Sequence, residues 1–250
     1  MTLIDSAAIA HNIEQVQAHI AEACQRTGRS IDDVTLVAVS KFQPPEAVLA
    51  ALEAGVTHFG ENRAEDALEK IAQVAQRTSK PITWHMIGHV QSRKAKLIYP
   101  AFSLVHSVDS LKLAQKLARQ AQEMGRPARI LLEVNVSGES SKEGFPAYDW
   151  QHNPATQHEL WRSLEAILAV PNVQVEGLMT MAPYEAKPEA TRPVFRSLAA
   201  LRERLAQDFG QPFATLSMGM TNDYAIAIEE GATLVRVGRA IFGERVYQTH

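Results

Sequence analysis

Lys41 is the residue of this chain whose position most directly suggests covalent chemistry. It follows the apolar, β-branched run 34–39 (VTLVAV) by two residues. Its amine is therefore expected at the end of a buried strand and not on an exposed helix. A lysine that is partly removed from water has a lowered pKa and can form a Schiff base with an aldehyde or a ketone. Most lysines instead extend the amine into solvent, and position alone does not choose between the two.

Two glycine-bearing turns are candidates for a phosphate site. The turn 217–221 (SMGMT) follows one apolar run, and the turn 238–240 (GRA) follows the last one. Gly219 allows the backbone to approach a ligand closely. Thr221 is expected to cap a helix over 222–230, whose first N–H groups would face an anion. One glycine would indicate only a tight turn, whereas two such turns near each other predict a phosphate site.

Arg236 interrupts the apolar segment 233–237 (TLVRV). A guanidinium in or near the core needs a hydrogen-bond acceptor. The ring nitrogen of pyridoxal 5′-phosphate (PLP) or a carboxylate could serve, and arginine is a known partner of that nitrogen. An ion pair with Glu133 is the alternative. Together with Lys41, the two turns and Arg236 favour PLP over a sugar phosphate held as an aldolase-type imine.

The elements that must position these residues form a regular alternation. Eight apolar runs alternate with helical patterns over 250 residues, which matches a (β/α)8 barrel, an α/β fold, in count and length. A doubly wound sheet is the alternative, but no GxGxxG follows the first run. The strands are expected over 34–39, 56–59, 82–87, 102–105, 129–136, 173–179, 213–216 and 233–237. Helices are expected over 46–54, 62–76, 92–99, 110–124, 154–170, 188–209 and 221–230, with an extra helix over 6–27.

In a barrel, the site lies at the carboxyl ends of the strands. The segment 137–153 is expected to be a long loop on that side, with Lys142 in it as a transient acceptor of PLP or as a solvated lysine. His106 either lines the mouth or is hydrogen-bonded in the barrel wall. The rule selects Ser40, Lys41, Glu61, Asn62, His85, Gly88, Gln91, His106, Ser107, Asn135, Ser137, Lys142, Thr180, Met181, the turn 217–221, Gly238 and Arg239.

Five segments carry a resemblance to a known family: AVSKFQPPEAVLAALEAGVTHFGENR, WHMIGHVQSRKAK, LLEVNVSGESSKEGF, GLMTMAP and LSMGMTNDYAIAIEEGATLVRVGRAIFGER. They are similar to the YggS/PROSC family of PLP-binding proteins, also called PLP homeostasis proteins. The resemblance covers nearly the whole chain and implies one domain, 1–250, with the barrel of the alanine racemase N-terminal domain. It implies that Lys41 carries PLP as an internal aldimine and that Arg236 lies beside the ring nitrogen. The other cofactor contacts that it implies are Asn62, Ser217, Met218, Gly219, Thr221, Gly238 and Arg239.

Two positions depart from the family pattern. The family often has serine where Thr221 stands, and threonine keeps the hydroxyl. It often has serine or threonine where Arg239 stands. Arg239 leaves mainly its backbone N–H for the ligand, while its guanidinium either adds a charge-assisted contact or faces solvent.

The same residues favour a PLP carrier over an enzyme. An arginine partner keeps the ring nitrogen unprotonated and makes the ring a weaker electron sink than an aspartate partner does, although alanine racemases also use arginine. Racemases of this fold take a second base from a partner chain and carry a further β domain. Here the barrel is expected to account for nearly the whole sequence, with only residues 244–250 after its last helical turn. A protein that buffers or delivers PLP is expected; a slow amino-acid racemase is the alternative, and a sugar-phosphate lyase is a third class.

Composition excludes several other classes. Twenty-eight acidic and twenty-five basic residues leave a net charge of −3, without the basic domain that nucleic-acid binding needs. No apolar run reaches the roughly 18 residues of a membrane helix. The single Cys24 excludes an internal disulfide and a cysteine metal cluster. Gly88 separates His85 from His89, so no metal site is expected there. We expect a cytoplasmic monomer, with PLP-dependent apo-enzymes as candidate recipients.

Overall fold

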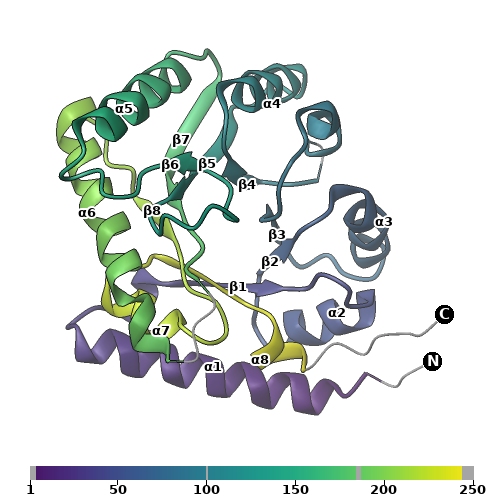
Figure 1. The fold of residues 1–250 in the computed structure, drawn as a ribbon. Helices are drawn as coiled ribbons and strands as arrows, with labels where there is room; N and C mark the ends of the chain where they lie inside the picture. Colours follow the sequence, from purple (N-terminus) through teal and green to yellow (C-terminus); the bar gives the residue numbers. More distant parts are fainter. Residues whose placement is uncertain (1–3, 100, 184–186, 244–250) are drawn as a thin grey trace.

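The computed structural model describes residues 4–99, 101–183 and 187–243, and its strands form a closed ring (Figure 1). Eight parallel strands pair in the order β1-β2-β3-β4-β5-β7-β8-β9, and β9 pairs with β1 to close the barrel. The expected barrel is confirmed and the doubly wound alternative is excluded. The strands are β1 (Thr35–Val39), β2 (His58–Glu61), β3 (Thr83–Met86), β4 (Leu104–Val108), β5 (Ala128–Asn135), β7 (Val173–Met179), β8 (Thr215–Ser217) and β9 (Leu234–Val237).

Three strands begin about two residues later than the apolar runs predict. The runs 56–59, 102–105 and 213–216 become β2, β4 and β8. Val56, Phe102 and Phe213 are buried just before their strands. The strands then continue through polar residues that a search for apolar runs passes over. All five residues of β4 are buried, including its histidine and serine. Polar side chains inside the barrel, and not weak strand formation, account for the shift.

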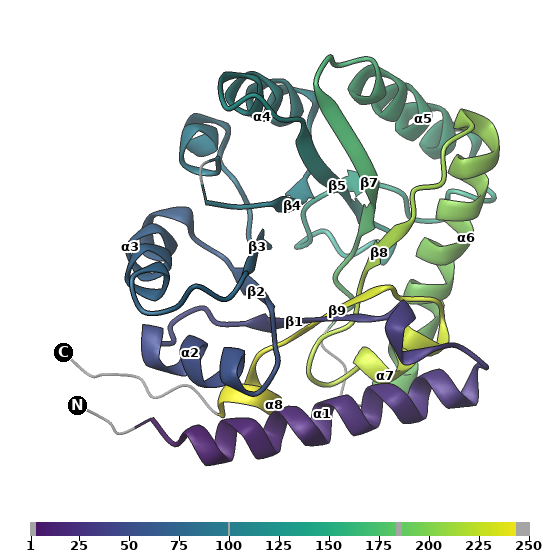
Figure 2. The ribbon, with the colours of Figure 1, turned by 180° about the vertical axis from the view of Figure 1, so that it is seen from behind.

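The helices surround the ring, and α1 lies along its outside against α2, α7 and α8 (Figure 2). Its buried residues recur every three or four positions, from Ile9 and Ile13 to Ile20 and Cys24, so one apolar stripe faces the barrel. The helices are α1 (Ser6–Arg26), α2 (Pro45–Glu53), α3 (Ala64–Ala75), α4 (Leu111–Glu123), α5 (Pro154–Leu168), α6 (Arg192–Phe209), α7 (Tyr224–Glu229) and α8 (Arg239–Phe242). None of the described helices is long and apolar enough to cross a membrane.

Several expectations for helices need correction. The segment 92–99 is a 3₁₀ helix over Ser92–Leu97, and 188–209 divides into a 3₁₀ turn (Pro188–Thr191) and α6. Thr221 does not cap α7, which begins only at Tyr224. The carboxylate of Asp223 instead accepts a hydrogen bond from the N–H of Met220 at 2.6 Å. That bond folds the turn back on itself and delays the helix.

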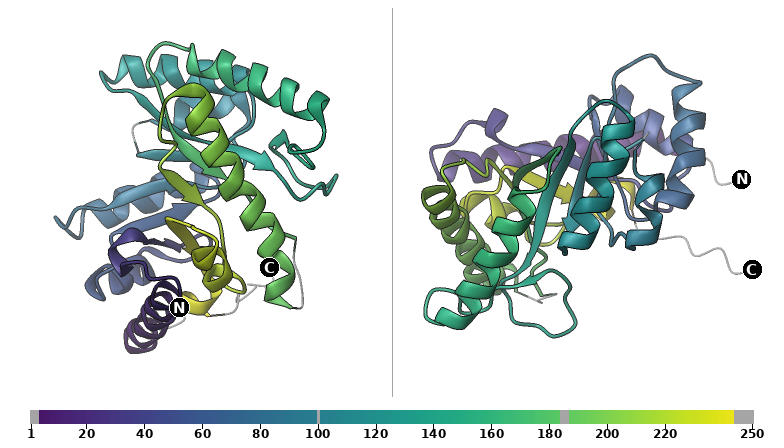
Figure 3. Two further views of the ribbon diagram at one scale, coloured as in Figure 1. Left: turned by 90° about the vertical axis from the view of Figure 1, so that its left-hand side faces the viewer. Right: turned by 90° about the horizontal axis from the view of Figure 1, so that it is seen from above.

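The segment 137–153 is a long loop, as expected, and extends from one end of the barrel (Figure 3). It contains one short strand, β6 (Phe145–Pro146), which pairs with the end of β5. The pairing ties the loop to the carboxyl end of β5 and so to the mouth of the barrel. The expectation for residues 244–250 lies outside the described residues.

Candidate functional site

A cavity of about 710 Å³ opens at the carboxyl ends of the strands. This is the end at which barrels of this type place their sites. Six of the nine residues that we predicted to contact PLP line the cavity: Lys41, Asn62, Thr221, Arg236, Gly238 and Arg239. The other three, Ser217, Met218 and Gly219, are buried and are not part of its lining. The structure therefore brings the predicted amine and the predicted phosphate turns to one cavity.

Lys41 stands where β1 turns toward α2. Its side chain is half-buried, and the next residue, Phe42, has a left-handed φ of 66°. Bulky residues rarely adopt this conformation, and such outliers concentrate at functional sites. The N–H of Gln43 donates to the carbonyl of Ser40 at 2.9 Å and closes the turn. The tight turn holds the backbone of Lys41 at the cavity wall.

A buried ion pair supports this turn from behind. The carboxylate of Glu61, which is 2% exposed, accepts hydrogen bonds from the Ser40 hydroxyl at 2.6 Å and from Lys70 Nζ at 2.8 Å. Lys70 Nζ also donates to the backbone carbonyl of Ser40 at 2.8 Å. Lys70, on α3, therefore neutralises Glu61 and fixes the residue next to Lys41.

Arg236 is a buried cation on β9, the strand that pairs with β1. It is 4% exposed, and it donates to Ser217 Oγ at 2.5 Å and to the carbonyl of Thr180 at 3.0 Å. Burial lowers its pKa to about 10, although Asp223 and Glu133 oppose the shift. Within the described part of the chain no carboxylate forms an ion pair with it, so the alternative pairing with Glu133 is not present. Its positive charge is available to a ligand in the cavity.

Glu133 lines the same cavity near the end of β5 and is 3% exposed. Burial first, and then the nearby carboxylates of Glu143 and Asp109, raise the pKa of its carboxyl to about 7. A carboxyl with this pKa can donate or accept a proton near neutral pH. Sequence reasoning considered Glu133 only as a partner of Arg236. An isolated acid in the apolar run LLEVNV was the signal that could have identified it.

The two predicted phosphate turns contribute unequally to the cavity. Gly219 has a φ of 90°, and a Cβ atom there would lie 2.6 Å from the Cβ of Ala227. The glycine is thus required for packing on α7. The N–H of Met218 already donates to the carbonyl of Leu234 at 3.2 Å. Met220 and Thr221 of the first turn, and Gly238 and Arg239 of the second, reach the lining. Ser217, Met218 and Gly219 remain predictions as direct contacts.

Arg239 lies on the solvent side of the lining. Its residue is exposed, and its Nη2 donates to the side-chain oxygen of Asn222 at 3.4 Å. The guanidinium therefore lies beside Asn222, the residue that follows the 217–221 turn.

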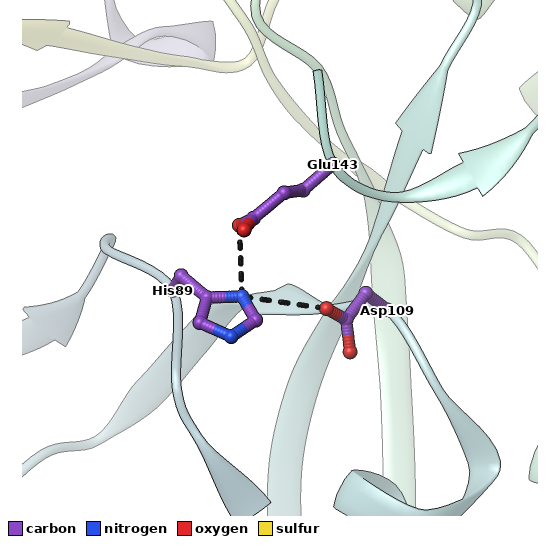
Figure 4. A group of neighbouring side chains, drawn as sticks. All are labelled: His89, Asp109 and Glu143. Carbon is purple, nitrogen blue, oxygen red and sulfur yellow. Dashed lines mark ion pairs between the residues drawn. The ribbon is translucent and has the colours of Figure 1, made fainter. Parts of the chain in front are cut away.

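His89, Asp109 and Glu143 form a charged group at the mouth (Figure 4). His89 Nδ1 lies 2.8 Å from Glu143 Oε2 and 3.4 Å from Asp109 Oδ2. The three ligand atoms lie within 4.8 Å of one another, so the group could hold a divalent cation. All three side chains are at least partly exposed, and direct bonds between the imidazole and the carboxylates account for the arrangement. His85 belongs to a different group, inside the barrel.

Sequence reasoning missed two residues because nothing local marks them. Lys70 is one of several charged residues on an amphipathic helix, yet it reaches Glu61. His58 begins β2 and lies 2.9 Å from His85, measured from Nδ1 to Nε2. His106 was left with two alternatives, and the structure selects the second: it is fully buried and hydrogen-bonded inside the barrel.

Comparisons with known proteins agree with this geometry. The sequence model of the family described as "Alanine racemase, N-terminal domain" matches residues 4–246. The chain is 44% identical over 239 residues to the pyridoxal phosphate homeostasis protein of Pseudomonas aeruginosa, covering 96% of each chain. It is 35% identical over 240 residues to the protein of that name from Escherichia coli, covering 96% of this chain and 97% of the other.

Solved structures are similar over the same length. PipY of Synechococcus elongatus, with PLP bound, superposes with a TM-score of 0.78 at 32% identity, covering 94% of this chain and all of that one (100%). Alanine racemase of Corynebacterium glutamicum has a TM-score of 0.64 at 17% identity, covering 95% of this chain and 60% of that chain. At that identity the likeness to the racemase concerns the fold.

Proposed function

This chain belongs to the family of pyridoxal phosphate homeostasis proteins, and from that premise we propose that it binds PLP in the barrel cavity and serves PLP homeostasis without turnover of its own. One observation carries the proposal. A primary amine, Lys41, and a buried guanidinium, Arg236, line a single cavity, and among the described residues no carboxylate forms an ion pair with that guanidinium. An aldehyde with an anionic tail and a basic ring nitrogen is complementary to that donor set.

Lys41 is the residue that would hold PLP. When bound, PLP supplies an aldehyde that combines reversibly with a primary amine, giving a Schiff base. Two of the described lysines line the cavity, and their backbones are held differently. Lys41 is held by a closed turn at the end of β1, whereas Lys142 lies in the long loop with its Nζ 3.7 Å from Glu139 Oε2. The fixed backbone favours Lys41, because a preorganised amine loses less entropy when it reacts.

Arg236 would face the ring nitrogen, and Thr221, Gly238 and Arg239 would face the phosphate. An arginine remains protonated and can only donate, so it holds an acceptor nitrogen in its unprotonated form. That form withdraws electrons weakly, which supports storage and delivery of PLP over carbanion chemistry. Asn62 follows β2, on the other side of Lys41 from these groups, and it also lines the cavity, where its amide can donate or accept.

The wider setting follows from the same proposal. PLP-dependent apo-enzymes are the proposed recipients of the cofactor. The proposed location is the cytoplasm, where such recipients are made, and the proposed state is a monomer.

The test is a visible spectrum before and after borohydride, followed by mass mapping of the modified lysine. The expected result is a yellow protein whose band disappears on reduction, with the label on Lys41. Lys41→Ala should abolish the band, and the matched variant of the second cavity lysine, Lys142→Ala, should keep it. A colourless protein in the presence of PLP, or a label on Lys142, would overturn the assignment.

A second measurement separates the carrier from a racemase. Exchange of the α-proton of amino acids is followed by NMR in deuterated water with the PLP-loaded protein. A carrier should exchange these protons no faster than free PLP does. Rapid exchange that Lys41→Ala abolishes would refute the carrier proposal and establish the racemase.

A further inference from the structure

Five side chains form one continuous hydrogen-bonded row through the barrel. Arg236 Nη1 donates to Ser217 Oγ at 2.5 Å, and that oxygen lies 2.9 Å from His106 Nδ1. His106 Nε2 lies 2.9 Å from His85 Nδ1. His85 Nε2 in turn lies 2.9 Å from His58 Nδ1. The three distances of 2.9 Å are those of ordinary hydrogen bonds, and the contact between Arg236 and Ser217 is shorter. We call this row the histidine relay.

The relay crosses the interior from one wall to another. Its members lie on β9, β8, β4, β3 and β2, and the bond between His106 and Ser217 joins strands that are not neighbours in the ring. His58 is the first residue of β2, at the amino-terminal end of the barrel, while Arg236 lines the cavity at the other end. Barrel interiors of this type are usually filled with branched apolar side chains. Here the space holds polar groups, which is tolerable only because each has a partner.

Donor chemistry gives the relay a direction. A guanidinium can only donate, so Ser217 Oγ accepts from Arg236 and its own hydrogen is free for His106 Nδ1. His106 must then carry its hydrogen on Nε2 and donate it to His85. His85 does the same toward His58. In the reverse order the Ser217 hydrogen would have no acceptor among the described residues, which is costly for a fully buried hydroxyl.

The relay orients Arg236 and does not deliver a proton to it. Burial lowers the pKa of His106 and His58 and lowers that of His85 to about 3, and neighbouring positive charges act in the same direction. The imidazoles are therefore neutral near neutral pH, while Arg236 keeps its charge. Bonds in such a row polarise one another, so a Ser217 hydroxyl that donates to His106 is a stronger acceptor for the guanidinium.

We propose that Ser217, His106, His85 and His58 are positioning residues that hold the guanidinium of Arg236 toward the cavity and transmit occupancy of the cavity to His58 at the far end of the barrel. This inference rests on the proposed function, because it takes Arg236 as the group that meets the PLP ring. A ligand acceptor at Arg236 draws its donors toward the cavity. The bond to Ser217 then changes, and the rest of the row changes with it.

The first test needs neither a variant nor a ligand. Nitrogen NMR of the histidine-labelled protein without PLP reports which ring nitrogen carries hydrogen. His106, His85 and His58 should each carry it on Nε2. His152, which is exposed and bonded to Asp149 outside the relay, is the internal reference. Hydrogen on Nδ1 of His106 or His85, or a mixture of both forms, would overturn the relay.

The second test adds PLP to the same sample. Resonances of His106, His85 and His58 should shift in step with the yellow band, while His152 should not move. Formation of the band on Lys41 with unchanged relay resonances would refute the transmission. Absence of any band would refute the proposed function instead, and the tautomers measured without PLP would still decide the relay.

Variants of Ser217 test positioning. Ser217→Ala removes the hydroxyl between Arg236 and His106, and it should weaken PLP retention by about tenfold, the loss expected for one hydrogen bond to a charged group. It should also leave His106 with a mixture of tautomers. Ser217→Thr keeps the hydroxyl and should preserve both properties. Ser197→Ala, which removes a hydroxyl bonded to Trp150 away from the cavity, is the control. Equal PLP retention in Ser217→Ala and Ser197→Ala would overturn the positioning role.

Discussion

Two cations lie on either side of β1, and their charges are compensated differently: Lys70 is largely buried behind the turn that follows β1, and Arg236 is buried on the neighbouring strand β9. Lys70 pairs with the carboxylate of Glu61 at 2.8 Å, behind the turn that carries Lys41. Arg236 has neutral acceptors, Ser217 and the carbonyl of Thr180. The charge of Lys70 is balanced by Glu61 within the protein, and the pair supports the backbone of the turn. Arg236 leaves a positive charge that a ligand can satisfy, so support and recognition depend on different side chains.

The largest expected effect on stability comes from breaking the ion pair between Lys70 and Glu61. Lys70→Met leaves Glu61 buried without its cation and should lower the free energy of unfolding by about 3–5 kcal/mol. Urea unfolding followed by circular dichroism measures it. The double variant Lys70→Met with Glu61→Leu should recover part of the loss, because no unpaired charge remains. Lys80→Met, at the exposed pair with Glu53, should stay within about 1 kcal/mol of the parent. A loss in Lys70→Met no greater than in Lys80→Met would show that the pair does not support the turn.

Arg236→Gln tests the buried cation that has only neutral acceptors. PLP affinity should fall by about 10- to 100-fold, the effect of losing a hydrogen bond to a charged group. Absorbance titration with PLP measures the affinity. The free energy of unfolding should fall less than in Lys70→Met, because Arg236→Gln removes a buried charge, whereas Lys70→Met leaves the buried carboxylate of Glu61 unpaired. If Arg236→Gln unfolds as readily as Lys70→Met, or binds PLP as well as the parent protein, the two sides are not divided between support and recognition.

Glu133 sharpens the comparison, because it is an acid in the cavity that does not neutralise Arg236. Its folded pKa, about 7, lies above the ordinary value of 4.5. The folded state therefore holds this proton more tightly than the unfolded chain does, and the resulting stability is present below pH 4.5 and lost as pH rises through 7. Glu133→Gln removes this dependence. The stability of the parent relative to Glu133→Gln should fall by on the order of 2 kcal/mol between pH 4.5 and pH 8.

Urea titrations at several pH values measure that difference. Glu143→Gln, at an exposed neighbour, is the matched control and should change the pH dependence far less. Parallel pH profiles of the parent and Glu133→Gln would mean that the pKa of Glu133 is not raised in the folded protein, contrary to its description above.

The smallest effect is expected at Lys142. Its contact with Glu139 is long and partly exposed, so Lys142→Ala should change PLP affinity by no more than about twofold. A second measurement tests whether Lys142 accepts PLP transiently. It is the rate of PLP transfer to an apo-enzyme, followed by recovery of that enzyme's activity. An unchanged rate would remove Lys142 as a transient acceptor, and a slower rate with unchanged affinity would establish it.

Most of the fold could be predicted because its signals are local. The apolar run 173–179 coincides with β7, and the helix that Pro45 opens stops just before Gly55, as helix signals indicate. The prediction failed in one turn where a side chain bonds the backbone three residues before it. The helix expected from Thr221 begins at Tyr224, because the Asp223 carboxylate bonds the Met220 N–H and holds the turn.

The sequence by itself determined the alternation of strands and helices, the resemblance to a PLP-binding family and the place of Lys41 at a strand end. These depend on backbone hydrogen bonding, on the period of apolar residues and on motifs that lie within short segments. Only the tertiary structure decided which polar groups meet. His106 and Ser217 are 111 residues apart and touch only because the ring closes. Arg236 could have paired with an acid or with a ligand, and closure placed a serine and a carbonyl beside it, leaving its charge toward the cavity.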